Sequence, residues 1–350
     1  MSGLHPWEQP IPLPDTDLAK AAEQHQQQLT KPPGSLGHLE QVAVRLAAQQ
    51  GTPTPAVERV WITVFAGDHG VCDEGVSAFP QAVTGQMIRN FSGGGAAISV
   101  LARHLGATLE VVNTGTVEPL PAMPGVLDAA IAPGTRNLAR EPAMSTSECE
   151  RALLVGDEAA ERAAQAGCDL FIGGDMGIGN TTSAAAIACA LLGWEPDGLV
   201  GRGTGVDDDG LARKRRAVAD GLRRHTTDTT PLEVLSSLGG LEIAALTGAL
   251  LGSARRRIPV LVDGFIVSVA ALVAVRHAPA AAHWLHFAHH SREAGHGVVL
   301  EALAATPLVD LDMRLGEGSG AGVTVPLLQA ACRLHNGMAT FATAGVSDGS

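Results

Sequence analysis

Apolar residues near the start of the chain recur at helical spacing. Residues 15–50 place apolar side chains three or four positions apart, which predicts two helices separated by a Lys-Pro-Pro-Gly break at residues 31–34. We expect Asp17 to cap the first helix and Ser35 to cap the second. A short linker rich in proline and threonine follows at residues 51–55. The pattern therefore predicts a helical N-terminal segment.

From residue 60 onward, short apolar runs alternate with helical stretches. Each run ends in glycine or histidine together with polar or acidic residues. The runs are Val60–Phe65, Leu109–Val112, Leu170–Ile172, Ile258–Val262 and Trp284–Phe287. This alternation predicts an α/β fold with a doubly wound, mostly parallel, Rossmann-like sheet. Because the carboxyl ends of parallel strands share one edge, we expect the polar residues after these runs to meet in one crevice.

The composition narrows the class of protein. Hydrophobic residues make up 45% of the chain, enough for a sizeable core. A net charge of -12 counts against a general nucleic-acid binder, which needs a basic surface. Five scattered cysteines without a CxxC pair are typical of reduced thiols in a cytoplasmic protein. The N-terminus has no signal-peptide pattern, and the apolar stretch 260–275 is too short for a membrane span.

The segment 314–322 holds the most distinctive candidate for chemistry. Its sequence, Arg-Leu-Gly-Glu-Gly-Ser-Gly-Ala-Gly, surrounds Glu317 with glycines, which let a ligand approach the carboxylate closely. Taken alone, the pattern also fits a solvated glutamate in a flexible turn. The string nearly matches a dinucleotide-binding fingerprint, but the βαβ unit that this fingerprint requires does not follow it.

Two further glycine-rich turns suit an anion. Residues 174–182 lead from a strand into an alanine-rich helix, where Asn180 and Thr181 can either bind a phosphate or cap the helix. Residues 201–205 form the second turn, and Lys214 in the next helix could reach the same anion. Histidines occur after two of the strands, but their spacing matches no zinc motif. We therefore expect no metal.

Taken in order, these segments resemble a known enzyme family, the nicotinate-nucleotide–dimethylbenzimidazole phosphoribosyltransferases of cobamide lower-ligand synthesis. The resemblance spans nearly the whole chain. It is carried by Leu-Thr-Lys-Pro-Pro-Gly-Ser-Leu-Gly at residues 29–37 and Arg-Leu-Gly-Glu-Gly-Ser-Gly-Ala at residues 314–321. Further matching strings are residues 66–71, 73–76, 176–182, 239–242 and 260–265. The two longer strings are highly specific together.

The resemblance implies transfer of a phosphoribosyl group from nicotinate mononucleotide to 5,6-dimethylbenzimidazole. Glu317 would act as the general base that takes the N–H proton of the benzimidazole. The product would be α-ribazole 5′-phosphate for the lower ligand of cobalamin. Because nicotinate is a stable leaving group, we expect neither a metal nor another cofactor.

The resemblance also implies roles for other residues. Phe79, Met87 and Leu315 would line the benzimidazole pocket, and Gly316 and Gly318 flank the base. Asp175 would face the ribose, while Asp263 could hold a ribose hydroxyl or orient the loop. The phosphate and sugar would be surrounded by Gly177, Asn180, Thr181, Gly203, Lys214 and Ser291.

The implied architecture is a homodimer in which both chain ends build a smaller helical lobe. We expect residues 1–55 and 323–350 to form this lobe and residues 56–322 to form a large α/β catalytic domain. Within the C-terminal part, the sequence predicts a helix from Pro326 to about His335.

Several alternatives remain at this point. Some relatives are expected to carry glutamate at position 175, and the shorter Asp175 leaves the ribose contact open. Some are expected to carry a small polar residue at position 79, so the accepted base could be adenine or a simpler benzimidazole. A nicotinamide-linked dehydrogenase would share the strand–glycine turns but needs a fingerprint in another place. A catalytically silent nucleotide- or azole-binding protein is the third alternative.

Overall fold

The sheet forms the centre of the protein. A computed structural model describes residues 4–225 and 229–347. Its six strands are β1 Val60–Gly67, β2 Thr108–Gly115, β3 Val126–Asp128, β4 Leu170–Met176, β5 Val260–Val262 and β6 Leu285–Phe287. All five strand pairings are parallel and the order is β3-β2-β1-β4-β5-β6. This is the order of doubly wound dinucleotide-binding sheets, so the predicted α/β fold with a parallel sheet is confirmed.

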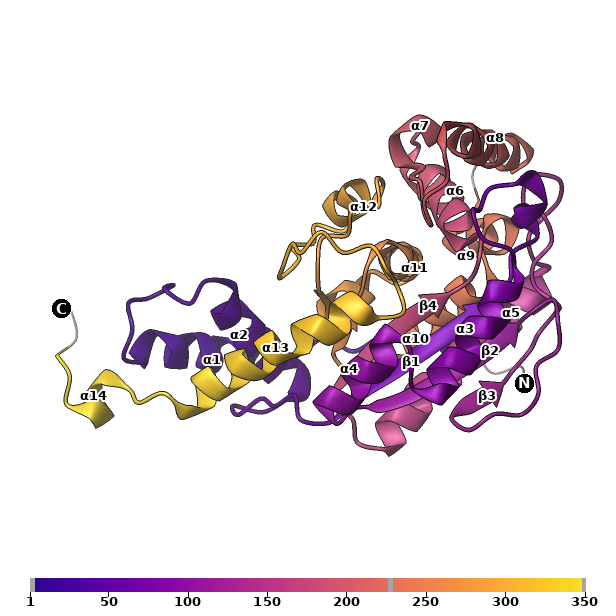
Figure 1. The fold of residues 1–350 in the computed structure, drawn as a ribbon. Helices are drawn as coiled ribbons and strands as arrows, with labels where there is room; N and C mark the ends of the chain where they lie inside the picture. The colour runs from indigo at the N-terminus through magenta and orange to yellow at the C-terminus, as the bar shows by residue number, and fades with distance from the viewer. Residues whose placement is uncertain (1–3, 226–228, 348–350) are drawn as a thin grey trace.

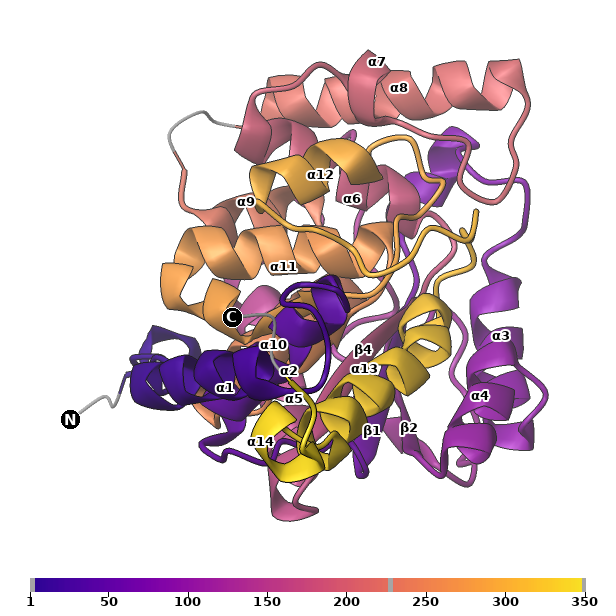
Figure 2. The ribbon, with the colours of Figure 1, turned by 90° about the vertical axis from the view of Figure 1, so that its left-hand side faces the viewer.

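Helices cover both faces of this sheet. The α-helices are α1 Thr16–Gln28, α2 His38–Gln50, α3 Ala82–Gly93, α4 Ala97–Leu105, α5 Thr146–Gln165, α6 Asn180–Leu192, α7 Pro196–Leu199, α8 Asp208–Arg224, α9 Pro231–Leu238, α10 Leu241–Arg255, α11 Phe265–His277, α12 His296–Ala302, α13 Ser319–Gly337 and α14 Phe341–Ala344. Short 3₁₀ helices are η1 Pro6–Glu8, η2 Gly70–Glu74 and η3 Pro279–Trp284. Helices α5, α10 and α11 pack on one face, and α3, α4 and α13 on the other (Figures 1 and 2). In the part of the chain described, no helix is both long and apolar enough to cross a bilayer.

The strand sequences explain this two-sided covering. In β1, Val60, Ile62 and Val64 enter one hydrophobic core, whereas Phe65 enters the other. Successive side chains of a strand point to opposite faces, so a strand that is apolar at nearly every position must be buried on both. The continuous apolar runs of the sequence are therefore central parallel strands.

The structure corrects several sequence-based boundaries. Asp15, not Asp17, caps α1, since its Oδ1 accepts hydrogen bonds from two amides of the first turn. Helix α2 begins after Gly37 rather than at Ser35, because residues 33–37 form turns. Strand β3 was not predicted, since three residues at the sheet edge leave almost no pattern.

The predicted start of the C-terminal helix at Pro326 is wrong. Helix α13 begins at Ser319 and runs unbroken through Pro326 to Gly337. Its first turn is stabilised by the buried Asp263 carboxylate, which accepts a hydrogen bond from the Ala321 N–H at 2.7 Å. This cap lies 58 residues away in sequence, so the local glycine-rich pattern gave no sign of a helix.

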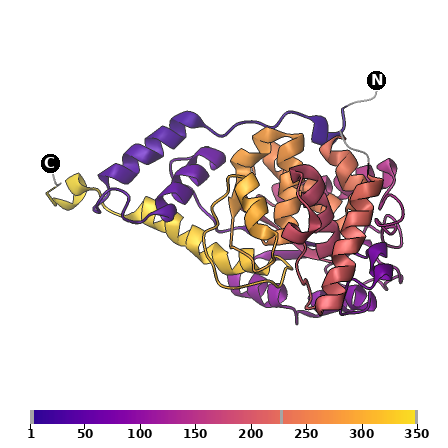
Figure 3. The ribbon, with the colours of Figure 1, turned by 90° about the horizontal axis from the view of Figure 1, so that it is seen from above.

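The two ends of the chain lie together at one side of the sheet. Helix α2 packs on both α1 and α13, and Leu29 forms an isolated antiparallel bridge with Thr340. The Gln26 Nε2 and His335 Nδ1 atoms are 2.8 Å apart in a buried contact. Figures 1 and 3 show α1 and α14 projecting away from the sheet.

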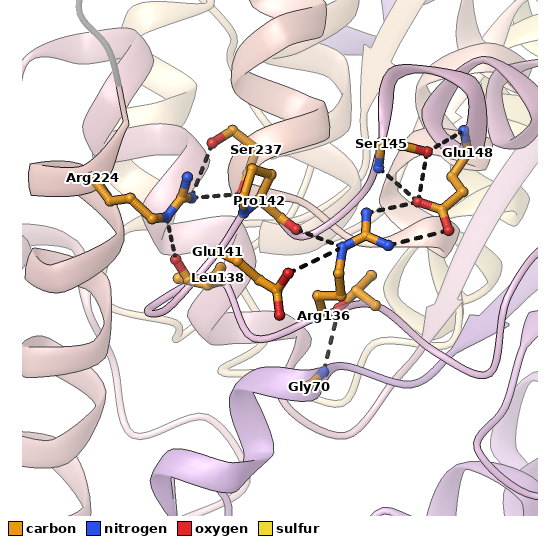
Figure 4. A network of polar contacts seen from close by, with 10 residues as sticks. Gly70, Arg136, Leu138, Glu141, Pro142, Ser145, Glu148, Arg224 and Ser237 are labelled. Atoms are coloured by element: carbon orange, nitrogen blue, oxygen red, sulfur yellow. Dashed lines mark hydrogen bonds and ion pairs between the residues drawn. The ribbon is translucent and has the colours of Figure 1, made fainter.

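A polar network fixes the segment that precedes α5 (Figure 4). The Arg136 guanidinium donates to Glu148 at 2.7 Å, and Glu148 also completes the cap of α5 with Ser145. The Gly70 N–H donates to the Thr135 hydroxyl at 3.3 Å. This last bond ties η2, which follows β1, to the segment that precedes α5.

Candidate active site

A cavity opens where the strand order reverses. Strands β1 and β4 are neighbours at the centre of the sheet, and their connections leave in opposite directions, which opens a crevice at their carboxyl ends. A cavity of about 320 Å³ lies there. It is lined by Phe79, Val83, Met87, Asp175, Met176, Gly177, Ile178, Asn180, Thr181, Gly203, Thr204, Gly264, Phe265, Ile266, His289, Ser291, Glu293, Arg314, Leu315, Gly316 and Glu317.

This cavity brings together eleven of the fourteen residues that the sequence proposed for the site. The remaining three lie behind its wall. Lys214 lies behind Thr181, to which it is hydrogen-bonded. Gly318 precedes α13, and Asp263 caps α13 through Ala321. For Asp263, the geometry therefore favours orientation of the loop over direct contact with a ligand.

The Glu317 loop has a backbone that its glycines make possible. Gly316, Glu317 and Gly318 all have positive φ angles, of 84°, 66° and 83°. The Glu317 N–H donates to the Asp175 carbonyl at 3.2 Å, which ties the loop to the end of β4. A β-carbon at Gly174 would collide with the Glu317 carbonyl group, so the close approach of loop and strand needs glycine there. The loop is thus held in a conformation that glutamate alone would disfavour.

The Glu317 carboxylate is buried at the cavity wall. Only 6% of the residue is exposed, and its Oε2 lies 3.5 Å from the Ile98 N–H at the start of α4. Burial raises the pKa of Glu317, the hydrogen bond from Ile98 lowers it, and the negative charge of Asp263 raises it. A carboxylate with a raised pKa is a better proton acceptor near neutral pH than an exposed one.

Asp175 is the second carboxyl group in the cavity. It accepts a hydrogen bond from the Asn180 side chain at 3.0 Å. Burial, followed by the charges of Asp263 and Glu242, raises the pKa of Asp175 well above its usual range. Its neutral form is therefore favoured, and a protonated carboxyl can donate to a hydroxyl.

The opposite side of the cavity suits an anion. Helix α6 begins at Asn180 beside the cavity, so the positive end of its dipole lies there. The buried Lys214 Nζ donates to the Thr181 hydroxyl at 2.7 Å, and burial lowers the pKa of Lys214 to about 8. Gly203 lies against both groups, because an added β-carbon would be 2.8 Å from Lys214 Nζ. Together these groups can hold one phosphate.

An apolar rim and a buried serine complete the cavity. Phe79 and Leu315 are half exposed, which leaves flat apolar surface available to a ring. Ser291 is buried, and its N–H donates to His296 Nδ1 at 2.8 Å. Burial lowers the pKa of His296 to about 3, so this histidine stays neutral and acts as an acceptor.

Sequence reasoning missed three contributors. Glu293 and Arg314 line the anion side of the cavity, and His69 forms a buried pair with Glu242 at 2.7 Å beneath its floor. Gly177 and Gly240 pack closely on the His69 ring. The matching strings at residues 66–71 and 239–242 each contain one member of this pair, but neither string indicates that the two side chains meet.

Comparisons with known proteins agree with this arrangement. A family model described as "Phosphoribosyltransferase" matches residues 11–346. Nicotinate-nucleotide–dimethylbenzimidazole phosphoribosyltransferases are similar to this chain: that of Pseudomonas aeruginosa is 59% identical over 95% of both chains, and that of Xanthomonas oryzae 56% identical over 96% of this chain and 97% of its own. The crystal structure of the enzyme so named from Thermus thermophilus superimposes with a TM-score of 0.92 at 49% identity, covering 96% of this chain and all of that one. The chain therefore belongs to the nicotinate-nucleotide–dimethylbenzimidazole phosphoribosyltransferase family.

Proposed function

We propose that this protein transfers the 5-phosphoribosyl group of nicotinate mononucleotide to 5,6-dimethylbenzimidazole. The products are α-ribazole 5′-phosphate and nicotinate, and the reaction serves assembly of the cobalamin lower ligand. One observation carries this proposal beyond family membership: a buried carboxylate, Glu317, shares a cavity with an anion site and an apolar rim. These are the parts that proton removal, phosphate anchoring and ring binding require.

The substrates fit the two sides of the cavity in one orientation. The phosphate lies near Thr181, Gly203 and Lys214, and the benzimidazole lies against Phe79 and Leu315. The ribose then spans the region of Asp175 and Asn180, where a carboxyl and an amide are available for its hydroxyls.

The reaction follows from this placement. Glu317 takes the N–H proton of the benzimidazole, and the other ring nitrogen attacks C1′ of the ribose. The bond from C1′ to nicotinate breaks, and its electron pair neutralises the pyridinium nitrogen. Attack from the face opposite nicotinate gives the α-nucleotide. General-base catalysis of this kind contributes roughly 10²–10⁴-fold, and positioning supplies the rest.

The proposal is tested by mass spectrometry of the products from nicotinate mononucleotide and dimethylbenzimidazole. Wild-type protein should form α-ribazole 5′-phosphate, whereas Glu317→Gln should bind both substrates and lose about 10²-fold or more of kcat. Glu301→Gln, a change at an exposed glutamate outside the cavity, serves as the matched control. Unchanged turnover in Glu317→Gln would falsify the role of this carboxylate.

An assay with a panel of bases identifies which one accepts the phosphoribosyl group best. Phe79 and Met87 present a broad apolar wall, so we propose dimethylbenzimidazole as the preferred base. Adenine and unsubstituted benzimidazole belong in the same assay. If adenine were consumed faster than dimethylbenzimidazole, the proposed acceptor would be wrong and the acceptor would be a purine. The proposal that the protein transfers a phosphoribosyl group would be unaffected.

We further propose a cytoplasmic homodimer with a separate helical lobe. The lobe would comprise residues 1–55 and 323–350, and the catalytic domain residues 56–322; residues 1–3 and 348–350 lie outside the described residues. Helix α1 has only Ala22 and Gln26 buried, and α14 has no buried residue. Helices with so little buried surface favour a partner subunit that covers them.

A further inference from the structure

The glycine-rich turn 201–205 is held from both sides by side chains that lie far away in sequence. On one side, Arg314 Nη1 donates to the Gly203 carbonyl at 3.3 Å. On the other side, the Gly203 backbone faces the Glu293 carboxylate. Burial, the larger effect, raises the pKa of this carboxylate, and the Gly203 backbone lowers it. The two charged side chains that flank Gly203 therefore both come from the segment that connects β6 to α13. Figure 2 shows the backbone course of this segment.

Neighbouring groups restrict the position of Glu293 against the turn 201–205. A β-carbon at Gly201 would lie 2.6 Å from Glu293 Oε2, so the carboxylate packs directly on the turn. The Glu293 N–H donates to the Ser291 hydroxyl at 3.3 Å, which fixes the glutamate backbone beside another cavity residue. Gly203 itself has a φ of 53°, a left-handed conformation suited to glycine.

The position of Gly203 determines the shape of the anion site. An added β-carbon would lie 2.7 Å from Thr181 Oγ1 and 2.8 Å from Lys214 Nζ, so the turn touches both groups. If Gly203 moved, the spacing between its backbone and the ammonium would change. A displacement of about 1 Å at such a site can cost on the order of 10²-fold in rate.

We propose that Glu293 and Arg314 are positioning residues for the substrate phosphate. They lie against Gly203 from opposite sides and thereby keep the turn 201–205 against Lys214 and Thr181. The inference rests on the proposed function, because it takes the phosphate of nicotinate mononucleotide as the anion. Neither residue needs to touch the reacting atoms.

The charge of Glu293 adds a second effect. It lies on the same side of the cavity as Lys214 and Arg314 and partly balances their positive charge before substrate binds. Its negative charge supports the protonated form of Lys214, opposing the effect of burial. Replacing it by glutamine keeps a polar side chain of the same length against the turn but removes this support.

Calorimetric titration tests the proposal without requiring turnover. Glu293→Ala and Arg314→Ala should each weaken binding of nicotinate mononucleotide by about tenfold, which is typical of losing a hydrogen bond to a charged group. Binding of the phosphate-free nicotinate riboside should stay unchanged in both variants. Arg333→Ala, a change at a surface ion pair, is the matched control.

Two comparisons separate positioning from general loss of structure. Because both side chains position one residue, Gly203, the double alanine variant should lose less than the sum of the single losses. Glu293→Gln should bind nicotinate mononucleotide like wild type at pH 7. As the pH rises into the alkaline range, its affinity should fall at a lower pH than that of wild type. This glutamine variant and Arg314→Lys remain informative if the alanine variants fail to fold.

Equal losses for the nucleotide and the riboside, or no loss for either, would overturn the proposal. So would strictly additive losses in the double variant. The proposed transferase function fails separately, if wild-type protein yields no α-ribazole 5′-phosphate. The binding measurements would still report on the phosphate site in that case.

Discussion

Two side chains of the site should give the reaction a pH window. Glu317 must be deprotonated to accept a proton, and burial raises its pKa above the usual value of 4.5, so kcat/KM falls as pH decreases through that raised pKa. Lys214 must be protonated to bind phosphate, and burial lowers its pKa to about 8, so kcat/KM for nicotinate mononucleotide falls as pH rises above about 8. A rate profile against pH measures both limits.

A matched pair of variants tests whether Lys214 causes the fall of kcat/KM at alkaline pH. Lys214→Arg should remove it, because a guanidinium stays protonated throughout this range. Lys20→Arg, at an exposed position, should leave it in place. An alkaline limit that persisted near pH 8 in Lys214→Arg would assign it to another group.

Single residues were predictable from sequence only where a local string marked them. Glu317 stood out because glycines surround it, and Asn180 because a helix begins there. Glu293 and Arg314 did not stand out, since the contact of Arg314 with Gly203 spans 111 residues. Likewise, His69 and Glu242 are 173 residues apart, and only packing reveals their pairing.

At the scale of elements, strand β4 and the Glu317 loop pack directly against each other through their backbones. Gly174→Ala should lower kcat by about 10²-fold, because its β-carbon would push against the backbone of Glu317, which cannot rotate aside as a side chain could. Gly337→Ala is the control, since a β-carbon at the end of α13 meets open space. Kinetic constants and melting temperatures of both variants would test this, and wild-type kcat in Gly174→Ala would contradict it.

The elements themselves were largely predictable because parallel strands are continuous apolar runs. All five predicted runs became strands, and polar residues that follow β4 and β6 line one cavity, with Asp263 after β5 directly behind its wall. The polar residues that follow β1 and β2 lie outside this cavity. The strand order and the short β3 could not be predicted, because pairing between strands leaves no mark within either sequence. The early start of α13 was missed because its stabilising group, Asp263, comes from another strand end.

At the scale of the whole molecule, the projecting helices bear on assembly. Leu13 and Val346 are 65% and 50% exposed beside α1 and α14, which favours burial against a second copy. Sedimentation equilibrium should therefore give twice the chain mass of 35.8 kDa across micromolar concentrations. A mass equal to one chain would contradict the proposed homodimer.

The left-handed backbone at Glu317 has a consequence for engineering this enzyme. A non-glycine residue in that conformation costs roughly 1 kcal/mol, which glycine would recover. Screens that select for heat resistance alone would then enrich glycine or asparagine at position 317 and remove the carboxylate that we propose as the general base. Directed evolution of this protein needs a selection for product in every round, because at this position durability and turnover are opposed.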